Sequence, residues 1–308
     1  MTRILITGKN GQVGHELQRA LAPLGELIAL DRKSLDLADA DAIHAVLNER
    51  RPDIIVNPAA YTAVDKAESE PELAQAVNAT APAAMARWAS EHDALLVHYS
   101  TDYVFNGRGD TPWREDDPAD PQSVYGLSKW NGEQAVRAVA PRHLILRTSW
   151  VFGAHGGNFL KTMLRLAGER QELKVVADQI GAPTSAALIA DTTAQLIRRY
   201  LTDSEGCPFG TYHLVASGET SWHGYAQYLI GQARLLGFPL ALSPDAVHGI
   251  PTEAYPLPAK RPANSRLNCG KLQRNYGITL PAWQQGVDAT LTALWQQRQA
   301  QQNVKESP

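Results

Sequence analysis

A tyrosine and a lysine stand four residues apart in the segment Tyr125-Gly-Leu-Ser-Lys129. On a helix, this i,i+4 spacing places both side chains on one face. Tyrosine has an ordinary pKa of about 10, so it serves as an acid–base catalyst near neutrality only where a neighbouring cation favours its phenolate. Lys129 is such a cation, and it could also bind the ribose of a nicotinamide cofactor. Taken alone, the Y-x-x-x-K pattern equally describes an ordinary surface pair.

A second group of polar side chains follows an apolar run that ends near Ser100. Ser100, Thr101 and Asp102 come where a strand is expected to stop, and open α/β sheets bind ligands outside the carboxyl ends of their strands. We therefore expect two hydroxyls and a carboxylate in the same cleft as Tyr125. The alternative is that the serine and the threonine only cap the strand end.

A glycine-rich turn lies between the first expected strand and the first expected helix. Glycine permits a tight turn and the close approach of a pyrophosphate, and a helix N-terminus offers free N–H groups and a positive dipole end. The turn therefore predicts dinucleotide binding, although any strand-to-helix turn could also use glycine. The residues assigned to the cofactor in this turn are Gly8, Asn10, Gly11, Gln12, Val13 and Gly14.

The adenosine end of the dinucleotide is expected near the end of the second strand. Asp31 can accept hydrogen bonds from the ribose hydroxyls of NAD, whereas Arg32, next to Lys33, could hold the 2′-phosphate of NADP. A solvated charge cluster would explain the two cations equally well, so NADPH and NADH both stay open. Asp36 and Leu37 could lie near the adenine or form a plain turn. Further residues expected against the cofactor, after the third strand, are Ala59, Ala60 and Tyr61.

Short apolar runs alternate with helical patterns through the first half of the chain. The alternation predicts an α/β fold with a doubly wound, Rossmann-type parallel sheet. Within the helical pattern at 72–91, Pro82 leaves open whether there are two helices or one kinked helix. The expected strands are 3–7, 27–31, 53–57, 94–100 and 143–149, and the expected helices are 12–24, 40–51, 72–91 and 125–139.

After Trp150 the pattern becomes less regular. Helical patterns at 158–167, 185–201, 221–236 and 280–301 are separated by connections that contain proline and glycine, and 254–264 reads as an extended loop. We therefore expect a dinucleotide-binding domain at 1–150 and a second, smaller, mainly substrate-binding domain at 151–308, with some segments returning to the first.

Composition excludes several classes of protein. The 308 residues include 29 Lys+Arg and 32 Asp+Glu, a formal net charge of −3, which gives no basic surface for nucleic acid or an anionic membrane. Neither a signal peptide nor an uncharged apolar run of about 20 residues is evident. The nine histidines and two cysteines form no metal-binding motif. We expect a cytoplasmic protein that uses no catalytic metal.

Longer motifs give the chain a resemblance to a known family. The glycine turn, the threonine at the fourth strand end and Y-x-x-x-K together resemble the extended short-chain dehydrogenase/reductase superfamily. Within it, the chain is similar to the dTDP-4-dehydrorhamnose reductase family over nearly its whole length. The matching segments are NPAAYTAVDKAE (57–68), HYSTDYVF (98–105), RTSWVF (147–152), DQIGAPT (178–184) and RPANSRL (261–267).

The resemblance implies a reaction, namely reduction of the C4 keto group of dTDP-4-dehydro-β-L-rhamnose to dTDP-β-L-rhamnose, the last step of dTDP-L-rhamnose biosynthesis. It implies that Tyr125 protonates the C4 oxygen while the nicotinamide delivers hydride. Lys129 would lower the pKa of Tyr125, and Thr101 would polarise the carbonyl.

The resemblance also assigns substrate contacts. Ser100, Asp102 and Trp150 would hold the sugar, while Asn158 and Arg261 would reach the nucleotide diphosphate, a group suited to a guanidinium. Without the resemblance, Trp150 reads as a core aromatic and Arg261 as half of a surface salt bridge.

Other members of the superfamily supply alternatives. The 4,6-dehydratases carry Thr-Asp-Glu at the fourth strand end; the third position here is Tyr103, which disfavours elimination of water. An epimerase with retained NAD would share Tyr125 and Lys129. A non-catalytic regulatory subunit, of the type that binds methionine adenosyltransferase, is a further alternative, which the intact Thr101, Tyr125 and Lys129 argue against.

The oligomeric state is open between monomer and homodimer. Some members of the family dimerise around Mg²⁺ held by acidic side chains. Glu16 and Asp191 are available here, but Ala187 stands where the family pattern has a glutamate, which disfavours a metal-bridged dimer.

Overall fold

The apolar runs of the first half form the parallel strands of one central sheet. The computed structural model describes residues 1–306, with side chains through residue 303, and within this range the sheet has six strands in the order β2-β1-β3-β4-β5-β10. These strands are β1 (Arg3–Ile6), β2 (Glu26–Ala29), β3 (Ile54–Asn57), β4 (Leu95–Thr101), β5 (His143–Thr148) and β10 (Gly210–His213). The strand order reverses at β1, which opens a crevice between β1 and β3 where such sheets bind ligands. The doubly wound fold is confirmed.

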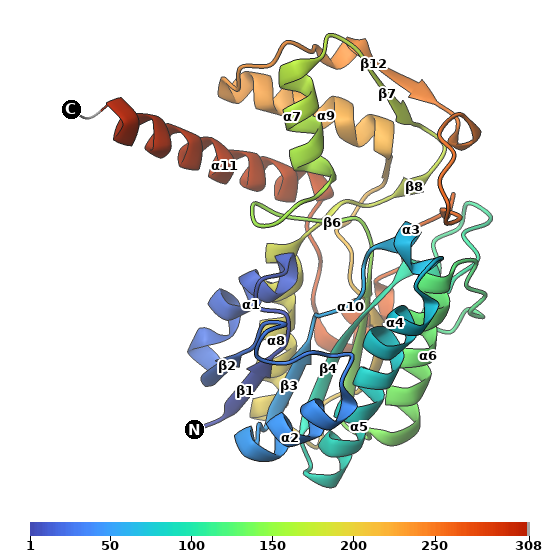
Figure 1. Cartoon of the computed structure of the whole chain (residues 1–308), viewed down its shortest axis with the longest axis vertical. Helices are drawn as coiled ribbons and strands as arrows, with labels where there is room; N and C mark the ends of the chain where they lie inside the picture. Colours follow the sequence, from blue (N-terminus) through green and yellow to red (C-terminus); the bar gives the residue numbers. More distant parts are fainter. Residues whose placement is uncertain (307–308) are drawn as a thin grey trace.

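Helices cover both faces of this sheet (Figure 1). Because successive strand residues point to opposite faces, Ile4 and Ile6 pack in one hydrophobic core while Leu5 packs in the other. The first core lies beneath α1 (Gln12–Leu21) and α8 (Ala186–Thr202). The second lies beneath α2 (Ala40–Arg50), α5 (Ala81–Glu91) and α6 (Val124–Val139). The glycine-rich turn and the Tyr125 helix thus approach the sheet from opposite faces.

The run that contains Pro82 is one helical stretch with an interruption. It consists of α4 (Pro71–Gln75), a π-helical segment (Ala76–Thr80) and α5. Pro82 has no N–H for the carbonyl of Asn78, four residues earlier. That carbonyl lies against Gly132 of α6, where any side chain would clash with it. Proline and glycine together let the two helices pack closely.

The sixth strand, β10, was not among the predicted strands. Its four residues, Gly-Thr-Tyr-His, are too few and too polar to stand out in the sequence. It pairs in parallel with β5, where the buried Tyr212 extends the first core. Part of the second half of the chain therefore completes the sheet, together with α8 and with α10 (Gly270–Tyr276), which packs beside β10.

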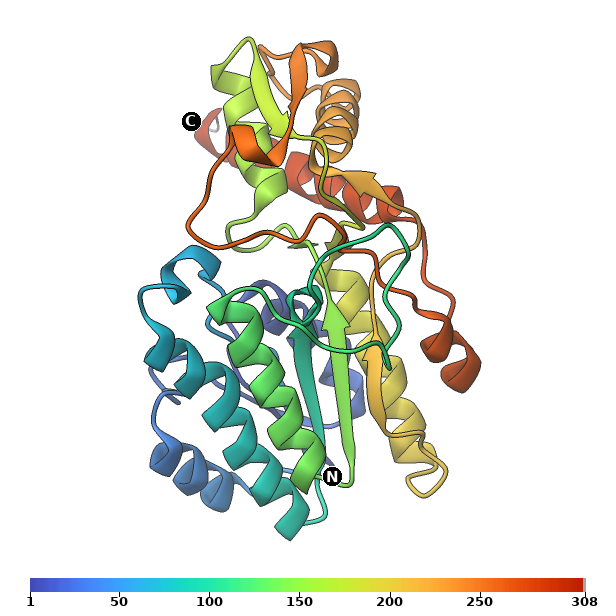
Figure 2. The ribbon, with the colours of Figure 1, turned by 90° about the vertical axis from the view of Figure 1, so that its right-hand side faces the viewer.

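A smaller lobe stands on the carboxyl-end side of the sheet (Figures 1 and 2). Its core lies among α7 (Phe159–Glu169), α9 (Trp222–Leu236) and α11 (Trp283–Glu306), beside the parallel pair β7 (Leu173–Val176) and β12 (Val247–Ile250). Short strands join the lobes, namely β6 (Val151–Phe152), β8 (Ile180–Gly181), β9 (Thr184–Ser185) and β11 (Thr220–Ser221). Within residues 1–306, no helix has the length and apolar character needed to cross a bilayer.

Candidate active site

Tyr125 lies in the first turn of α6, against the end of β4. Ser123 caps this helix, since its hydroxyl accepts a hydrogen bond of 3.1 Å from the backbone N–H of Gly126. A side chain at Gly126 would clash with the carbonyl of Tyr103, so glycine lets the helix start directly beside the strand end. The rings of Tyr103 and Tyr125 meet edge to face, with centroids 5.4 Å apart. This packing brings the two predicted catalytic segments together.

Thr101 and Asp102 occupy that strand end and are almost fully buried. The Thr101 hydroxyl donates to Asp102 Oδ1 at 3.0 Å and accepts from the backbone N–H of Tyr103 at 3.2 Å. Among the described residues, Asp102 Oδ2 and Ser100 Oγ have no hydrogen-bond partner. Burial raises the pKa of Asp102 to about 6, although the hydroxyls of Ser265 and Thr101 oppose the shift. The strand end therefore offers buried polar atoms for a ligand.

Burial also raises the pKa of Tyr125, to about 12, and the nearby Thr101 hydroxyl only partly opposes this. The shift is opposite in direction to the expected lowering by Lys129. The reason is that burial disfavours the phenolate, while the Lys129 ammonium is bonded elsewhere. A phenol with a raised pKa stays protonated near neutrality, which is the form that a general acid requires.

Lys129 lies one turn further along α6, and its side chain is buried. Its Nζ donates to the Tyr99 carbonyl at 2.6 Å and lies 3.3 Å from His98 Nε2. Burial lowers the pKa of Lys129 to about 8, and the carboxylate of Glu133 partly offsets the shift. Lys129 therefore changes charge close to the physiological range.

The glycine-rich turn has the geometry that the sequence predicts. Gly8 has a left-handed φ of +58°, and a side chain there would press into Ala59, while one at Gly14 would clash with the Gly8 carbonyl. Gly11 precedes α1 without providing a side-chain cap. The first N–H groups of α1, from Gln12 and Val13 onward, therefore belong to a helix end suited to an anion.

Polar groups of the turn also contact the smaller lobe. The Asn10 carbonyl lies 3.0 Å from His155 Nε2. Gln12 receives a 2.9 Å hydrogen bond at Oε1 from Asn158 Nδ2. The Asn158 amide also caps α7 by accepting from the backbone N–H of Lys161 at 3.0 Å, so its polar atoms are engaged within the protein.

Asp31 follows β2, as expected, at the far side of the turn. The Ser34 hydroxyl and backbone N–H, followed by Lys9 at 3.4 Å, lower the pKa of Asp31 to about 2. Arg32 is largely exposed and lies 3.8 Å from Asp36, so its guanidinium is accessible to a ligand.

Other residues assigned to the adenosine differ in accessibility. The Leu37 side chain is buried in the second core, so only its backbone can face an adenine. Ala59, Ala60 and Tyr61 follow β3 and are partly exposed. The Tyr61 hydroxyl donates to Glu70 at 2.6 Å, and this carboxylate raises the pKa of Tyr61.

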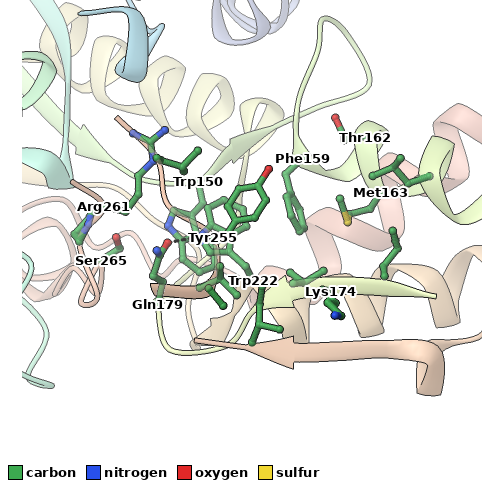
Figure 3. A pocket seen from close by; sticks show the side chains of 18 of the residues that line it. Trp150, Phe159, Thr162, Met163, Lys174, Gln179, Trp222, Tyr255, Arg261 and Ser265 are labelled. Atoms are coloured by element: carbon green, nitrogen blue, oxygen red, sulfur yellow. Dashed lines mark hydrogen bonds between the residues drawn. The ribbon is translucent and has the colours of Figure 1, made fainter. Parts of the chain in front are cut away.

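A cavity of about 740 Å³ lies between the strand end and the smaller lobe (Figure 3). Tyr103 lines it and connects it to Tyr125. Aromatic rings form much of its wall, and Figure 3 shows Gln179, Ser265 and Arg261 toward one end. The aromatic residues of the wall that Figure 3 labels are Trp150, Phe159, Trp222 and Tyr255.

Trp150 is a wall of this cavity and not a core residue. Its φ of +49° is strained for a residue with a bulky side chain. Its indole stacks on Trp222, with centroids 3.7 Å apart, and a side chain at Gly181 would clash with it. These contacts fix the ring at the junction of the two lobes.

Arg261 also lines the cavity, but it already has one partner. Its Nη2 donates to Asp65 in α3 (Val64–Ala67) at 2.7 Å, and the backbone N–H of Ala259 donates to the same carboxylate at 3.1 Å. Arg261 Nη1 has no partner among the described residues. The segment after β12, which carries Arg261 and runs between the lobes in Figure 2, is thereby tied to the sheet lobe.

Sequence reasoning missed several residues of this site. Gln179 stood within the quoted motif DQIGAPT, so a signal was present, whereas Trp222 and Tyr255 lie in segments whose pattern gives no sign of a pocket. His98 likewise stood in a quoted motif, yet its contact with Lys129 depends on the packing of α6 against β4.

The two acidic residues considered for Mg²⁺, Glu16 and Asp191, both pair with the same arginine. Arg19 pairs with Glu16 at 3.3 Å and with Asp191 at 2.7 Å. In the part of the chain that the structure describes, no group of three metal-ligating side chains could hold an ion.

Residues 1–296 match the RmlD substrate binding domain family. The chain belongs to this family. It is 54% identical over 296 residues to the dTDP-4-dehydrorhamnose reductase of Salmonella typhimurium, covering 95% of this chain and 98% of the relative. It is 46% identical over 287 residues to the enzyme of the same name from Burkholderia thailandensis, covering 92% and 96%. A crystal structure of the Bacillus anthracis reductase with NADP is 36% identical, with a TM-score of 0.85 over 95% of this chain and 100% of that one.

Membership of the RmlD substrate binding domain family confirms the resemblance found in the sequence. These relatives carry the names of reductases, and none is named an epimerase or a regulatory subunit.

Proposed function

We propose that this chain is a dTDP-4-dehydrorhamnose reductase, which reduces the C4 keto group of dTDP-4-dehydro-β-L-rhamnose with NADPH or NADH and yields dTDP-β-L-rhamnose. The observation that carries the proposal is the proximity of Thr101 to a protonated Tyr125, whose ring contacts Tyr103 in the wall of a cavity of about 740 Å³. The relatives named for this reaction match the chain over nearly its whole length. Family and site chemistry thus point to one reaction.

The residues of the turn fit a nicotinamide dinucleotide. Gly8 and Gly14 leave room that a side chain would fill, and the uncapped start of α1 suits a pyrophosphate. Asp31, ionised because of its low pKa, suits a ribose hydroxyl, and the accessible Arg32 suits a 2′-phosphate. The bound cofactor would supply a hydride equivalent. We propose that Lys129 binds its nicotinamide ribose.

Tyr125 and Thr101 handle the carbonyl oxygen in this proposal. As C4 accepts hydride, negative charge grows on its oxygen, and the Tyr125 hydroxyl gives up its proton to that oxygen. The Thr101 hydroxyl, which donates to Asp102 in the structure, turns to the same oxygen and stabilises the charge. Tyr103 occupies the place of the glutamate of a dehydratase, and a phenol whose pKa is raised by burial is a poor base for C5.

The two lobes divide the work in this proposal. The sheet lobe, residues 1–150 together with the segments that return to it, holds the cofactor. The smaller lobe holds the sugar nucleotide, with Trp150 and Asp102 at the sugar. The free Nη1 of Arg261 suits a diphosphate oxygen.

The test is an assay of NADPH and NADH oxidation by the full chain with dTDP-4-dehydro-β-L-rhamnose, run beside other 4-keto nucleotide sugars. We expect turnover with the rhamnose precursor and a product that has gained two hydrogens. Tyr125→Phe is the matched control, because it removes only the proton donor. If neither cofactor is oxidised with any of these sugars, the proposed reaction is wrong.

A further inference from the structure

Lys129 faces a buried histidine, His98, to which the proposed reaction gives no role. His98 lies on β4 with none of its surface exposed. Its Nε2 is 3.3 Å from Lys129 Nζ, and the same ammonium donates to the carbonyl of the adjacent Tyr99 at 2.6 Å. Two consecutive residues of β4 therefore hold the end of the Lys129 side chain.

His98 is itself held by a row of polar residues across the sheet. Its Nδ1 lies 3.1 Å from Asn57 Nδ2, and Asn57 Oδ1 accepts from Thr7 Oγ1 at 2.6 Å. The pairing of β3 with β4 sets Asn57 directly opposite His98, and Thr7 follows the neighbouring β1. All of these side chains are buried, so water does not complete their hydrogen bonds.

The hydrogens in this row can be assigned from their donors and acceptors. An ammonium has only donors, so His98 Nε2 must accept from Lys129. A neutral imidazole then carries its hydrogen on Nδ1 and needs an acceptor. The Asn57 amide supplies one when its oxygen and nitrogen exchange places, so that the oxygen faces His98 and the nitrogen faces Thr7. Burial, with the nearby Lys129 charge, lowers the pKa of His98 well below its ordinary value, so the ring is neutral.

We propose that His98 is a positioning residue for Lys129. As the neutral Nδ1–H tautomer fixed by Asn57, it accepts a hydrogen bond from the ammonium, which keeps Lys129 charged and aligned with the cofactor site. The role assigned to Lys129 rests on the proposed function, but the hydrogen bond itself does not.

Other groups near Lys129 bear on its charge. On α6, the Glu133 carboxylate one turn further on favours the ammonium. Arg147 of β5 and Arg137 of α6 both bond that carboxylate and partly neutralise it. On β4, only the Tyr99 carbonyl and His98 bond the ammonium directly. Burial opposes the charge, so the His98 acceptor has a large share in keeping it.

The experiment compares three substitutions of His98. Leucine removes the acceptor; glutamine can place an amide oxygen near Nε2, and asparagine can reach only the Nδ1 end. We expect the alkaline limb of kcat, set by a Lys129 pKa of about 8, to move to lower pH by about one unit in His98→Leu and His98→Asn, and to stay in His98→Gln. His213→Leu, another fully buried histidine, should leave the limb unchanged.

A second measurement needs no sugar substrate. In protein labelled with ¹⁵N in histidine, the His98 ring should give the signature of a neutral Nδ1–H tautomer between about pH 6 and 7, where Lys129, with a pKa of about 8, is still an ammonium. The affinity for NADPH should fall in His98→Asn and recover in His98→Gln.

An Nε2–H tautomer, or equal pH limbs and NADPH affinities in the asparagine and glutamine variants, would overturn the role of His98. If His98→Leu does not fold, the comparison of kcat and NADPH affinity between His98→Asn and His98→Gln still tests the role of His98. Failure of the proposed reaction would appear differently, as no turnover in the unsubstituted protein despite the expected tautomer.

Discussion

A buried ion pair beside Lys129 allows a prediction worked from the structure. Glu133 of α6 accepts two hydrogen bonds from Arg147 of β5, from Nε to Oε1 at 2.8 Å and from Nη2 to Oε2 at 2.7 Å. Glu133 is fully buried and Arg147 is 1% exposed. Arg137 adds a third bond to Oε2 at 2.8 Å. Lys129 and Glu133, one turn apart, thus dock α6 onto β4 and β5.

Glu133→Gln keeps the shape of the side chain and removes its charge. The remaining partners of Arg147 are the Glu115 carbonyl at 3.2 Å and the ring faces of Phe105 and Trp130, so its charge stays buried without a counterion. Breaking one side of such a pair costs about 3–5 kcal/mol of unfolding free energy. We expect a loss near the lower end, because glutamine retains one acceptor, and a fall in Tm of about 5 °C.

Removal of both charges should cost much less than removal of one. In Glu133→Leu combined with Arg147→Met, apolar side chains replace the pair, and such replacements are often close to neutral. A double-mutant cycle should therefore give a favourable coupling of about 2 kcal/mol or more between positions 133 and 147. Losing the Glu133 carboxylate also lowers the Lys129 pKa further, so the alkaline limb of kcat should move to lower pH in Glu133→Gln.

The assay is denaturant unfolding followed by circular dichroism and by the fluorescence of the seven tryptophans, since coincident transitions establish two-state behaviour. The reasoning is refuted if Glu133→Gln lies within about 0.5 kcal/mol of the unsubstituted protein, the range of ordinary surface changes. A double variant no more stable than Glu133→Leu alone would refute it as well.

Three further predictions concern the strand end and the catalytic helix. Tyr125→Phe should lower kcat by about 10²–10⁴-fold, the usual contribution of a general acid, with NADPH affinity unchanged in a fluorescence titration; an unchanged kcat would remove Tyr125 from the mechanism. Lys129→Met should weaken NADPH binding and turnover together, and a loss confined to kcat would contradict a ribose contact. Asp102 has a folded pKa of about 6, above its ordinary value of 3.8, so its contribution to stability is present below about pH 4 and is lost as pH rises through 6. Asp102→Asn should therefore gain stability relative to the unsubstituted protein by about 3 kcal/mol between pH 4 and 7, measured by unfolding at each pH, and a gain independent of pH would contradict the raised pKa.

The sequence by itself determined the elements that carry the chemistry. Alternating apolar runs and helical patterns located β1 through β5 and the helices between them, because burial of a strand or helix face is a local property of the pattern. The glycines of the turn follow from backbone sterics, and the shared helix face of Tyr125 and Lys129 follows from helical geometry. These features depend on residues that are close in the chain.

The tertiary structure alone decided how those residues interact. The direction of the Tyr125 pKa shift depends on burial and on where Lys129 is bonded, and the partners of Lys129 are His98, 31 positions away in the chain, and the Tyr99 carbonyl. Asp65 and Arg261 meet across 196 positions. Such contacts depend on the register of the sheet and the packing of two lobes, which no short window of sequence encodes. Charge and hydrogen-bond partners are therefore set by the fold, even where the residue types that use them can be read from the sequence.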